Sequence, residues 1–371
     1  MLFQAPMLTE REREVIDSIE DARRRLQYLL HEPRRWHGLL RRLIAAGNIR
    51  ASTGIEGHHV SRDDAVAAVD RSDPFEATRT DWEAVLGYQE AMTFIIQLAG
   101  DPHFSYNTSL VRSIHYLMMR HDPECEPGRY RPGDIFVGEY QAPDPEVVPV
   151  LAGELMDHLN DDSNTTELLI RAAMAHLNLI MIHPFKDGNG RMSRALQTLV
   201  LGREGPLDPR FSSIEEYLGH NTPGYYQVLA DVGGSSWNPG RDTRPWIRFV
   251  ITAHHYRAHL MAWRVEEADR VWDRISELRS RARLDERNMG SLYNAAMGLR
   301  VRRADHLDYA GVSERVATSD LRRLVDLGFL EAVGERRGRY YVATDRLRSR
   351  SERKRPRVPD PFGPVVVTPV P

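Results

Sequence analysis

Two apolar helical segments joined by a short polar turn constrain the fold of this chain more than any other feature of its sequence. Residues 165–182 and 190–203 carry apolar side chains at helical spacing, and the turn between them contains Pro184, Gly188 and Gly190. Proline prevents the first helix from continuing, and glycine can adopt positive φ and let a ligand approach the main chain. The second helix therefore directs its free N–H groups into the turn, which predicts an anion-binding site there.

The remaining sequence predicts a mainly helical protein. Other segments with helical periodicity lie between breaks rich in Gly, Pro, Asp and Asn, and they cover residues 10–30, 36–46, 81–98, 107–119, 148–160 and 245–283. The second of these is expected to stop near Gly47. Residues 129–143 instead alternate around Pro132-Gly133, which predicts a short hairpin.

Composition narrows the class of protein. The chain has 371 residues and a single cysteine, Cys125, which excludes an internal disulfide and fits a reducing compartment. No apolar run reaches the roughly 18 residues of a spanning helix, and the N-terminus lacks the order of a signal peptide. We therefore expect a cytoplasmic protein with no membrane partner.

Charge is distributed unevenly along the chain. Residues 270–357 hold 22 Arg and Lys against 13 Asp and Glu, whereas residues 1–269 hold 28 against 39. In the basic part, residues 312–328 predict a helix that ends at a glycine, and residues 329–342 predict a strand, a basic turn and a second strand. This asymmetry indicates two modules with different partners.

The polar turn carries side chains suited to phosphate chemistry. Asp187 offers a hard oxygen ligand for Mg²⁺, which prefers one or two carboxylates plus phosphate oxygens. Arg191 and Arg194 lie three residues apart on one helix face, where their guanidinium groups suit polyphosphate. His183 can accept a proton near neutral pH, and Phe185 is expected to anchor the loop.

The stretch from His183 to Arg194 resembles the signature of the Fic family, His-Pro-Phe-x-(Asp/Glu)-Gly-Asn-Gly-Arg-x-x-Arg, at every specified position. The resemblance implies a Fic-fold helical domain that transfers AMP from ATP to a Ser, Thr or Tyr hydroxyl of a protein. It makes His183 the general base and Asp187 the Mg²⁺ ligand. The residues that it assigns to the nucleotide phosphates, with Asn189 and the turn backbone on the α-phosphate, are Gly188, Asn189, Gly190, Arg191, Met192, Ser193 and Arg194.

A second motif lies upstream. Ser52-Thr53-Gly54-Ile55-Glu56-Gly57 resembles the inhibitory motif of the same family, (Ser/Thr)-x-x-x-Glu-(Gly/Asn). The resemblance implies that Glu56 pairs with Arg194 in the place of the γ-phosphate, with Ser52 and Gly57 completing the motif. A carboxylate can do this because it presents two oxygens to a guanidinium, as a phosphate does.

Two other segments match the family by position. The hairpin around Ile135 to Tyr140 corresponds to the flap that pins an extended target segment, with an ordinary hairpin as the alternative. Tyr225 and Tyr226, together with Asn221, resemble the end of the site that holds adenine and ribose, although tyrosines in such positions are more often part of a core.

The basic C-terminal part resembles a winged helix, with residues 313–327 as the recognition-type helix and Arg336, Arg337 and Arg339 in the wing. Its use for DNA or for protein contacts is left open. The expected organisation is an N-terminal helical region with the inhibitory motif, a Fic catalytic domain, a connecting helix, a small winged-helix α/β domain and a disordered tail. Their boundaries are residues 1–100, 101–265, 266–287, 288–347 and 348–371.

Several alternatives stay open at this point. The chain can be a nucleotide-sensing DNA-binding regulator, or it can transfer another phosphate-containing group such as UMP, phosphocholine or phosphate, or remove AMP. Its expected partners are ATP and a protein substrate, and that substrate can be the protein itself. A homodimer is a further option. His255 and His259 stand four apart, a spacing that can bind zinc, but no third ligand is evident and packing histidines are favoured.

Overall fold

The structure is a computed structural model that describes residues 1–161, 163–335, 338–348 and 356–363. Its described part is mainly helical, with two small antiparallel hairpins. The chain divides into two compact units, the first formed by residues 1–28, 44–259 and 357–371 and the second by residues 29–43 and 260–356. Among the described residues no helix combines the length and the apolar character needed to cross a membrane.

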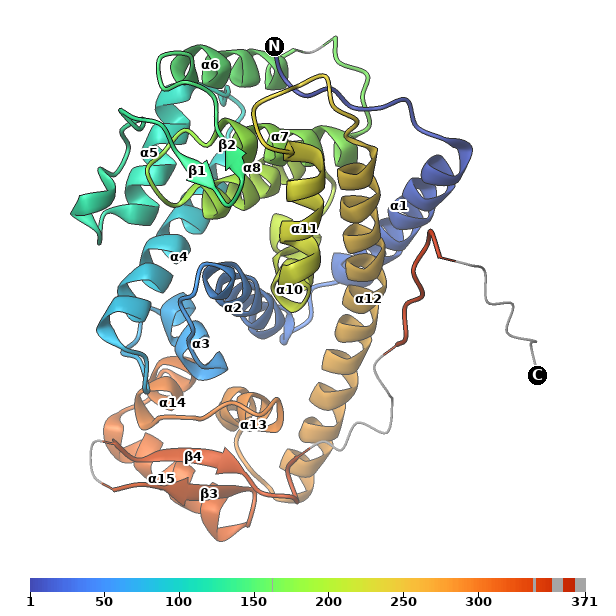
Figure 1. Ribbon diagram of the computed structural model, residues 1–371. Coiled ribbons are helices and arrows are strands. Elements are labelled where there is room, and N and C mark those ends of the chain that lie inside the picture. Colours follow the sequence, from blue (N-terminus) through green and yellow to red (C-terminus); the bar gives the residue numbers. More distant parts are fainter. Residues whose placement is uncertain (162, 336–337, 349–355, 364–371) are drawn as a thin grey trace. The chain divides into compact units, whose positions relative to one another are not determined.

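Most of the α-helices follow one another with short connections (Figure 1). Their bounds are α1 Glu10–His31, α2 His37–Ile55, α3 Arg62–Asp70, α4 Arg79–Ala99, α5 Thr108–Met119, α6 Val148–Leu159, α7 Leu168–Ile182, α8 Asn189–Glu204, α9 Pro209–Ser212, α10 Glu215–His220, α11 Thr222–Gly233, α12 Arg244–Arg281, α13 Met289–Ala296, α14 Arg303–Ala310 and α15 Glu314–Asp326. The strands are β1 Phe136–Val137, β2 Tyr140–Gln141, β3 Leu330–Val333 and β4 Tyr340–Ala343, and two 3₁₀ turns lie at Pro123–Cys125 and Glu286–Asn288.

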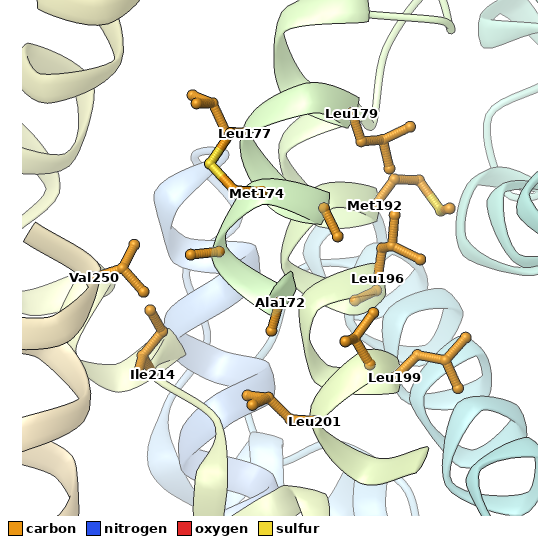
Figure 2. Close-up of a cluster of buried hydrophobic side chains, with 14 of the residues drawn as sticks. Ala172, Met174, Leu177, Leu179, Met192, Leu196, Leu199, Leu201, Ile214 and Val250 are labelled. Atoms are coloured by element: carbon orange, nitrogen blue, oxygen red, sulfur yellow. The ribbon is translucent and has the colours of Figure 1, made fainter. Parts of the chain in front are cut away.

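Helices α7 and α8 form the centre of the first unit. Nearly every side chain of α7 is buried, as expected for a helix that is apolar on all faces. Figure 2 shows Leu177 and Leu179 of α7 together with Leu196 and Leu199 of α8 in this core. Helix α4 packs against both α5 and α8, and α6 packs against α7. The polar turn between α7 and α8 is therefore held at both ends by buried helices.

Helix α2 corrects one expectation from the sequence. The prediction that a helix ends near Gly47 is wrong, because α2 continues to Ile55. A side chain at Gly47 would collide with the carboxylate of Glu216 in α10. Similarly, a side chain at Gly219 of α10 would lie 3.0 Å from Cβ of Ala51. Gly47 thus permits a close approach between α2 and α10 instead of ending a helix.

The hairpin between α5 and α6 is shorter than expected, and its turn is elsewhere. Phe136 pairs with Gln141 and Val137 with Tyr140, so the chain reverses at Gly138, which has φ +61°. The prediction of a turn at Pro132-Gly133 is wrong. That dipeptide precedes the strands, and the carbonyl of Gly133 accepts a hydrogen bond from Arg131.

In the second unit, α13, α14 and α15 are followed by the β3–β4 hairpin, in which Leu330 pairs with Ala343. Val301 adds an antiparallel bridge to Tyr341 at the hairpin edge. Helix α15 is fixed by Arg287, whose guanidinium donates to both carboxylate oxygens of Asp320 at 2.6 and 2.9 Å. Of the expected wing residues, Arg336 and Arg337 lie outside the described residues.

The tail differs in part from the expected disorder over residues 348–371. Residues 356–363 are described, and the carbonyl of Pro361 accepts two hydrogen bonds from Arg11 of α1. The ring of Phe362 lies under the guanidinium of Arg248 at 5.4 Å. This short segment therefore packs on the first unit, while residues 349–355 and 364–371 lie outside the described part.

Candidate phosphate-binding site between helices α7 and α8

The turn between α7 and α8 is closed by its own side chains. His183 follows α7 with φ +50°, and Gly188 precedes α8 with φ +78°. The Asn189 side chain spans the turn: its Oδ1 accepts from the main-chain N–H of Phe185 at 2.9 Å, and its Nδ2 donates to the Phe185 carbonyl at 2.8 Å. The Asn189 side chain therefore shapes the loop, and its second N–H is left for the expected contact with the α-phosphate, which stays a prediction.

Helix α5 supports the turn from one side through His115. The ring of His115 stacks on Phe185 with centroids 3.7 Å apart and an interplanar angle of 6°. Its Nδ1 accepts from the N–H of Gly128 at 2.8 Å, so Nε2–H donates to the carbonyl of Asp187 at 2.9 Å. Burial lowers the pKa of His115 to about 4, which keeps the ring neutral. A side chain at Gly188 would lie 2.9 Å from Sδ of Met119, so this helix needs a glycine opposite it.

His183 has the geometry of a neutral base. Its Nδ1 lies 3.1 Å from the carbonyl of Ile180, which can only accept, so Nδ1 carries the proton and Nε2 keeps its lone pair. Burial lowers the pKa of His183 below its ordinary value. Arg131 donates from Nε to the His183 carbonyl at 2.8 Å, and it also binds the carbonyl of Pro143 at the base of the hairpin. The base and the hairpin are thereby tied to one guanidinium.

Arg191 and Arg194, in the first turns of α8, are both fully buried but have different surroundings. Arg191 lies 3.8 Å from Asp187, and its Nε and Nη1 are buried with no hydrogen-bond partner among the described residues. Buried N–H groups of a charged side chain are costly unless an anion satisfies them. Arg191 therefore fits an anionic ligand bound at the start of α8.

Asp187 is suited to hold a metal ion together with such a ligand. Its side chain is 57% exposed, and Oδ1 accepts from the N–H of Gly188 at 2.6 Å. The described residues contain no group of three or more His, Cys, Asp or Glu that would form a protein-only metal cage. A single exposed carboxylate beside a phosphate site is the donor set that Mg²⁺ accepts, with water and phosphate oxygens completing its shell.

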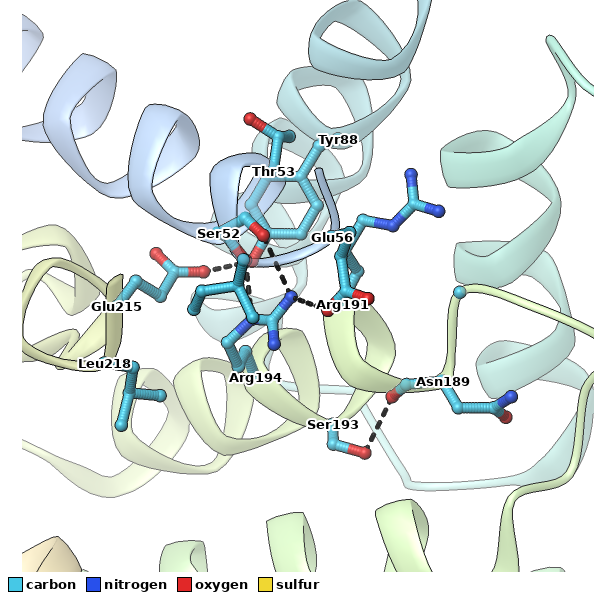
Figure 3. A network of polar contacts seen from close by, with 12 residues as sticks. Ser52, Thr53, Glu56, Tyr88, Asn189, Arg191, Ser193, Arg194, Glu215 and Leu218 are labelled. Atoms are coloured by element: carbon cyan, nitrogen blue, oxygen red, sulfur yellow. Dashed lines mark hydrogen bonds and ion pairs between the residues drawn. The ribbon is translucent and has the colours of Figure 1, made fainter. Parts of the chain in front are cut away.

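Arg194 turns toward the end of α2 (Figure 3). Its Nη2 donates to Oε1 of Glu56 at 2.6 Å and to the carbonyl of Ser52 at 3.0 Å, and its Nε donates to the Ser52 hydroxyl at 2.7 Å. Burial by itself would lower the pKa of Arg194, but the neighbouring carboxylate of Glu56 raises it above its ordinary value. A side chain at Gly190 would collide with the Glu56 carboxylate. The structure thus brings the upstream motif and the turn together, and Gly57 ends the motif with φ +89°.

Two buried residues that the sequence did not single out complete this cluster. Glu215 of α10 is 2% exposed, and its Oε1 accepts from the hydroxyl of Tyr88 in α4. The Ser213 hydroxyl donates to Glu215 Oε2 at 2.9 Å. Burial raises the pKa of Glu215. No local signal marks these residues, since Glu215 stands beside a second glutamate and would be assigned to a solvated surface.

Four side chains assigned to nucleotide binding have protein partners, and two of them, Tyr225 and Tyr226, lie near the Arg194–Glu56 pair. Met192 is buried in the core, and the hydroxyl of Ser193 donates to the carbonyl of Asn189 at 2.8 Å within α8. Tyr225 is also buried, and its hydroxyl lies 2.9 Å from Nε2 of His176. Tyr226 is half-exposed and donates to the carbonyl of Ile55 at 3.2 Å. Met192 and Ser193 can therefore serve a ligand only through the main chain, and Tyr226 contacts the end of α2.

Comparison with known proteins agrees with this geometry. Residues 105–201 match the model of the Fic/DOC family. The fold resembles that of a Fic family protein from Desulfovibrio desulfuricans, with a TM-score of 0.58 and 22% identity over 92% of this chain and 99% of that one. It also resembles residues 134–508 of Fic-1 from Caenorhabditis elegans, with a TM-score of 0.57 and 22% identity over 69% of this chain and 73% of that one. The expectation of a mainly helical Fic fold is confirmed.

The molecule is thus a helical protein with a polar, glycine-containing turn at the N-terminus of α8. More specifically, its segment 105–201 is similar to the Fic domain, since it matches the model of the Fic/DOC family.

Curated relatives of the chain carry an enzyme name. The chain is 28% identical to protein adenylyltransferase fic-1 of Caenorhabditis elegans over 267 residues, which is 70% of this chain and 48% of the relative. It is 32% identical to protein adenylyltransferase Fic of Nematostella vectensis over 45% of this chain and 36% of the relative. The chain therefore spans about half or less of the length of these relatives.

Proposed function

We propose that this protein is an adenylyltransferase that transfers AMP from ATP to a hydroxyl of a protein, and that Glu56 restrains it in the resting state. The observation that carries the transfer is the neutral His183 beside a helix N-terminus at which Arg191 has two buried N–H groups without a partner. The names of the relatives support the same activity. The identity of the modified protein is a further proposal, and self-modification is one form of it.

The residues divide the chemistry among them. His183 accepts the proton of the attacking hydroxyl at Nε2, the hydroxyl oxygen bonds to the α-phosphorus, and the bond to the bridging oxygen of pyrophosphate breaks. The free N–H groups at the start of α8, with Arg191, bind phosphate oxygens. Mg²⁺, when bound, would neutralise charge on the leaving pyrophosphate, and Asp187 is the residue that would hold it.

The restraint rests on the pair between Glu56 and Arg194. Both groups are largely removed from water, where a charge-assisted hydrogen bond of 2.6 Å is strong. Arg194 bound in this way does not have its full guanidinium available for the outer phosphates of ATP. We propose that transfer becomes efficient when this pair separates.

Replacing Glu56 tests both parts of the proposal. The Glu56→Gly protein, incubated with labelled ATP and Mg²⁺, should transfer AMP at least about tenfold faster than the wild type, equivalent to roughly 1.4 kcal/mol. Mass spectrometry should show an added AMP on a hydroxyl. Adding His183→Ala to Glu56→Gly should abolish the signal.

The same experiment separates the alternatives. If labelled UTP, CDP-choline or γ-labelled ATP modifies the protein faster than ATP labelled in its AMP part, the transferred group is UMP, phosphocholine or phosphate instead of AMP. Loss of AMP from a premodified protein, requiring Glu56, would indicate removal instead of transfer. No labelling in Glu56→Gly at saturating ATP would contradict the proposed activity.

A DNA-binding regulator is a second candidate, favoured by one surface of the second unit. Helix α15 exposes Arg315, Ser319 and Arg322 at spacings of four and three residues, so they share one face. The pair of Arg287 with Asp320 fixes the opposite face. We therefore propose that the second unit acts as a winged helix that contacts DNA through this face of α15. The domain boundaries at residues 265 and 288 remain predictions.

Salt dependence tests this candidate on the full chain. A fluorescent mixed-sequence duplex should bind at about 50 mM salt and be released at about 200 mM salt, because phosphate contacts displace counterions. Replacing Arg315 and Arg322 together by Ala should reduce the slope of log K against log salt by about 2. Absence of binding at low salt would remove the candidate.

A further inference from the structure

Counting the hydrogen bonds of Arg194 shows that Glu56 provides a minority of them. Of its three bonds to the end of α2, two go to Ser52, one from Nε to the hydroxyl at 2.7 Å and one from Nη2 to the carbonyl at 3.0 Å. Nη1 is buried and has no hydrogen-bond partner among the described residues. If Glu56 moves away, Nη1 and the second N–H of Nη2 form a free edge, the fork that binds phosphate in a bidentate manner.

The Ser52 hydroxyl is in turn directed by two other residues. Because it accepts the N–H of Arg194, its own proton must go to another acceptor. Glu215 and Tyr88 both lie beside it and interact with it electrostatically. Tyr88 donates its own hydroxyl proton to Glu215. The cluster thus contains the bonds of Arg194 to Ser52 and of Tyr88 to Glu215, side by side (Figure 3).

Burial and packing make this cluster rigid. The side chains of Ser52, Tyr88, Arg194 and Glu215 are at most 2% exposed, and they come from α2, α4, α8 and α10. Hydrogen bonds inside a buried cluster are strong because water does not compete for them. At Gly219, helix α10 closely approaches Ala51 of α2, the neighbour of Ser52 in the sequence. None of these contacts involves Glu56, so they can persist without it.

We propose that Ser52, Glu215 and Tyr88 are positioning residues that hold Arg194 with its Nη1–Nη2 edge toward the γ-phosphate of ATP, whether Glu56 is present or not. The inference rests on the proposed function, which it deepens by assigning the recognition of the third phosphate to a carboxylate on α10. Ser52 then has two opposite effects, since it helps to place Arg194 for Glu56 and also for ATP. The Glu56→Gly background isolates the second effect.

Nucleotide binding in the full-length Glu56→Gly/His183→Ala protein tests the inference without any reaction. Adding Ser52→Ala or Glu215→Gln should weaken ATP binding about tenfold in calorimetry and leave AMP binding unchanged, because AMP lacks the γ-phosphate. The matched control is Thr53→Val, which removes the neighbouring hydroxyl of the same helix. That hydroxyl donates to the carbonyl of Ile49 at 3.0 Å and should leave both nucleotides unaffected.

In the active Glu56→Gly protein the same substitutions, and Tyr88→Phe, should raise KM for ATP about tenfold and change kcat less than twofold. An equal loss of ATP and AMP affinity would show that the cluster only maintains the fold, and unchanged ATP affinity in Ser52→Ala would equally overturn the inference. If Glu56→Gly transfers no AMP but still prefers ATP over AMP through Ser52, the proposed activity fails and the positioning role stands.

Discussion

Asn189 illustrates how a residue can serve a candidate binding site by shaping its loop. Its amide uses both the donor and the acceptor on the main chain of Phe185, four residues earlier. The ring of Phe185 is then free to stack under His115. The turn is therefore shaped before any ligand arrives, and preorganisation of this kind lowers the cost of binding.

Replacing Asn189 by Ala should accordingly impair both stability and activity. The substitution leaves the buried N–H and carbonyl of Phe185 without partners, at a cost of about 1–3 kcal/mol each. We expect a lower Tm and a lower kcat/KM, measured by thermal unfolding and by labelled transfer in the Glu56→Gly background. Ser193→Ala is the control, since its hydroxyl bonds only within α8. A stable Asn189→Ala protein with unchanged kinetics would contradict the assignment.

At the level of elements, glycines decide how closely helices approach. Gly87 of α4 faces the main chain of α5, where an added Cβ would collide with the carbonyl of Met118. Gly153 of α6 has no atom within 4 Å of such a Cβ. Both lie inside helices, where alanine is intrinsically preferred by roughly 0.5–1 kcal/mol. The two positions differ in the atoms that surround them, since the helix propensity of glycine is the same at both.

This pair predicts opposite shifts in stability. Gly87→Ala should destabilise the protein by about 1–3 kcal/mol because a backbone carbonyl cannot move aside without parting α4 from α5. Gly153→Ala should stabilise it by about 0.5–1 kcal/mol. Urea unfolding monitored by circular dichroism measures both. Equal effects of the two substitutions would mean that α4 and α5 do not pack as described.

The interior of the first unit contains ionisable groups that matter for the molecule as a whole. His115 and His176 are fully buried, and burial lowers the pKa of the first to about 4 and of the second to about 3. Glu12 is also buried, between Arg244 at 2.7 Å and Arg248 at 2.8 Å. These groups link folding to proton uptake.

Stability should therefore fall in mild acid. In the unfolded chain a histidine has a pKa near 6.5, so the unfolded state binds protons below about pH 6.5. The folded state binds them only near pH 4 at His115 and near pH 3 at His176. The stabilisation is complete above about pH 6.5 and decreases by roughly 1 kcal/mol per pH unit for each such histidine below it. Thermal unfolding across this range should show a shallower decrease for His176→Gln and an unchanged one for His103→Gln, an exposed histidine. Identical slopes for both variants would refute this linkage.

The turn was predictable from the sequence because its determinants are contiguous: Pro184, the two glycines and the flanking apolar helices act locally. The contact of Ser52 and Glu56 with Arg194 joins segments about 140 residues apart, and only the resemblance to a family motif suggested it. Tyr88 and Glu215 are 127 residues apart and carry no motif, so only the fold reveals them. The expectation that the helix ends near Gly47 was wrong for a related reason. Whether a glycine ends a helix or permits close packing against another helix depends on residues far along the chain, here Glu216.

The location of Glu56 directly after α2, in the same polypeptide as Arg194, has a kinetic consequence. A carboxylate attached in this way competes with an incoming triphosphate at an effective concentration that geometry sets. Dilution or changes in expression level do not alter that concentration. Under the proposed restraint, the fraction of active molecules would respond to whatever displaces the last turn of α2, and it would be the same in a dilute as in a concentrated solution of the protein.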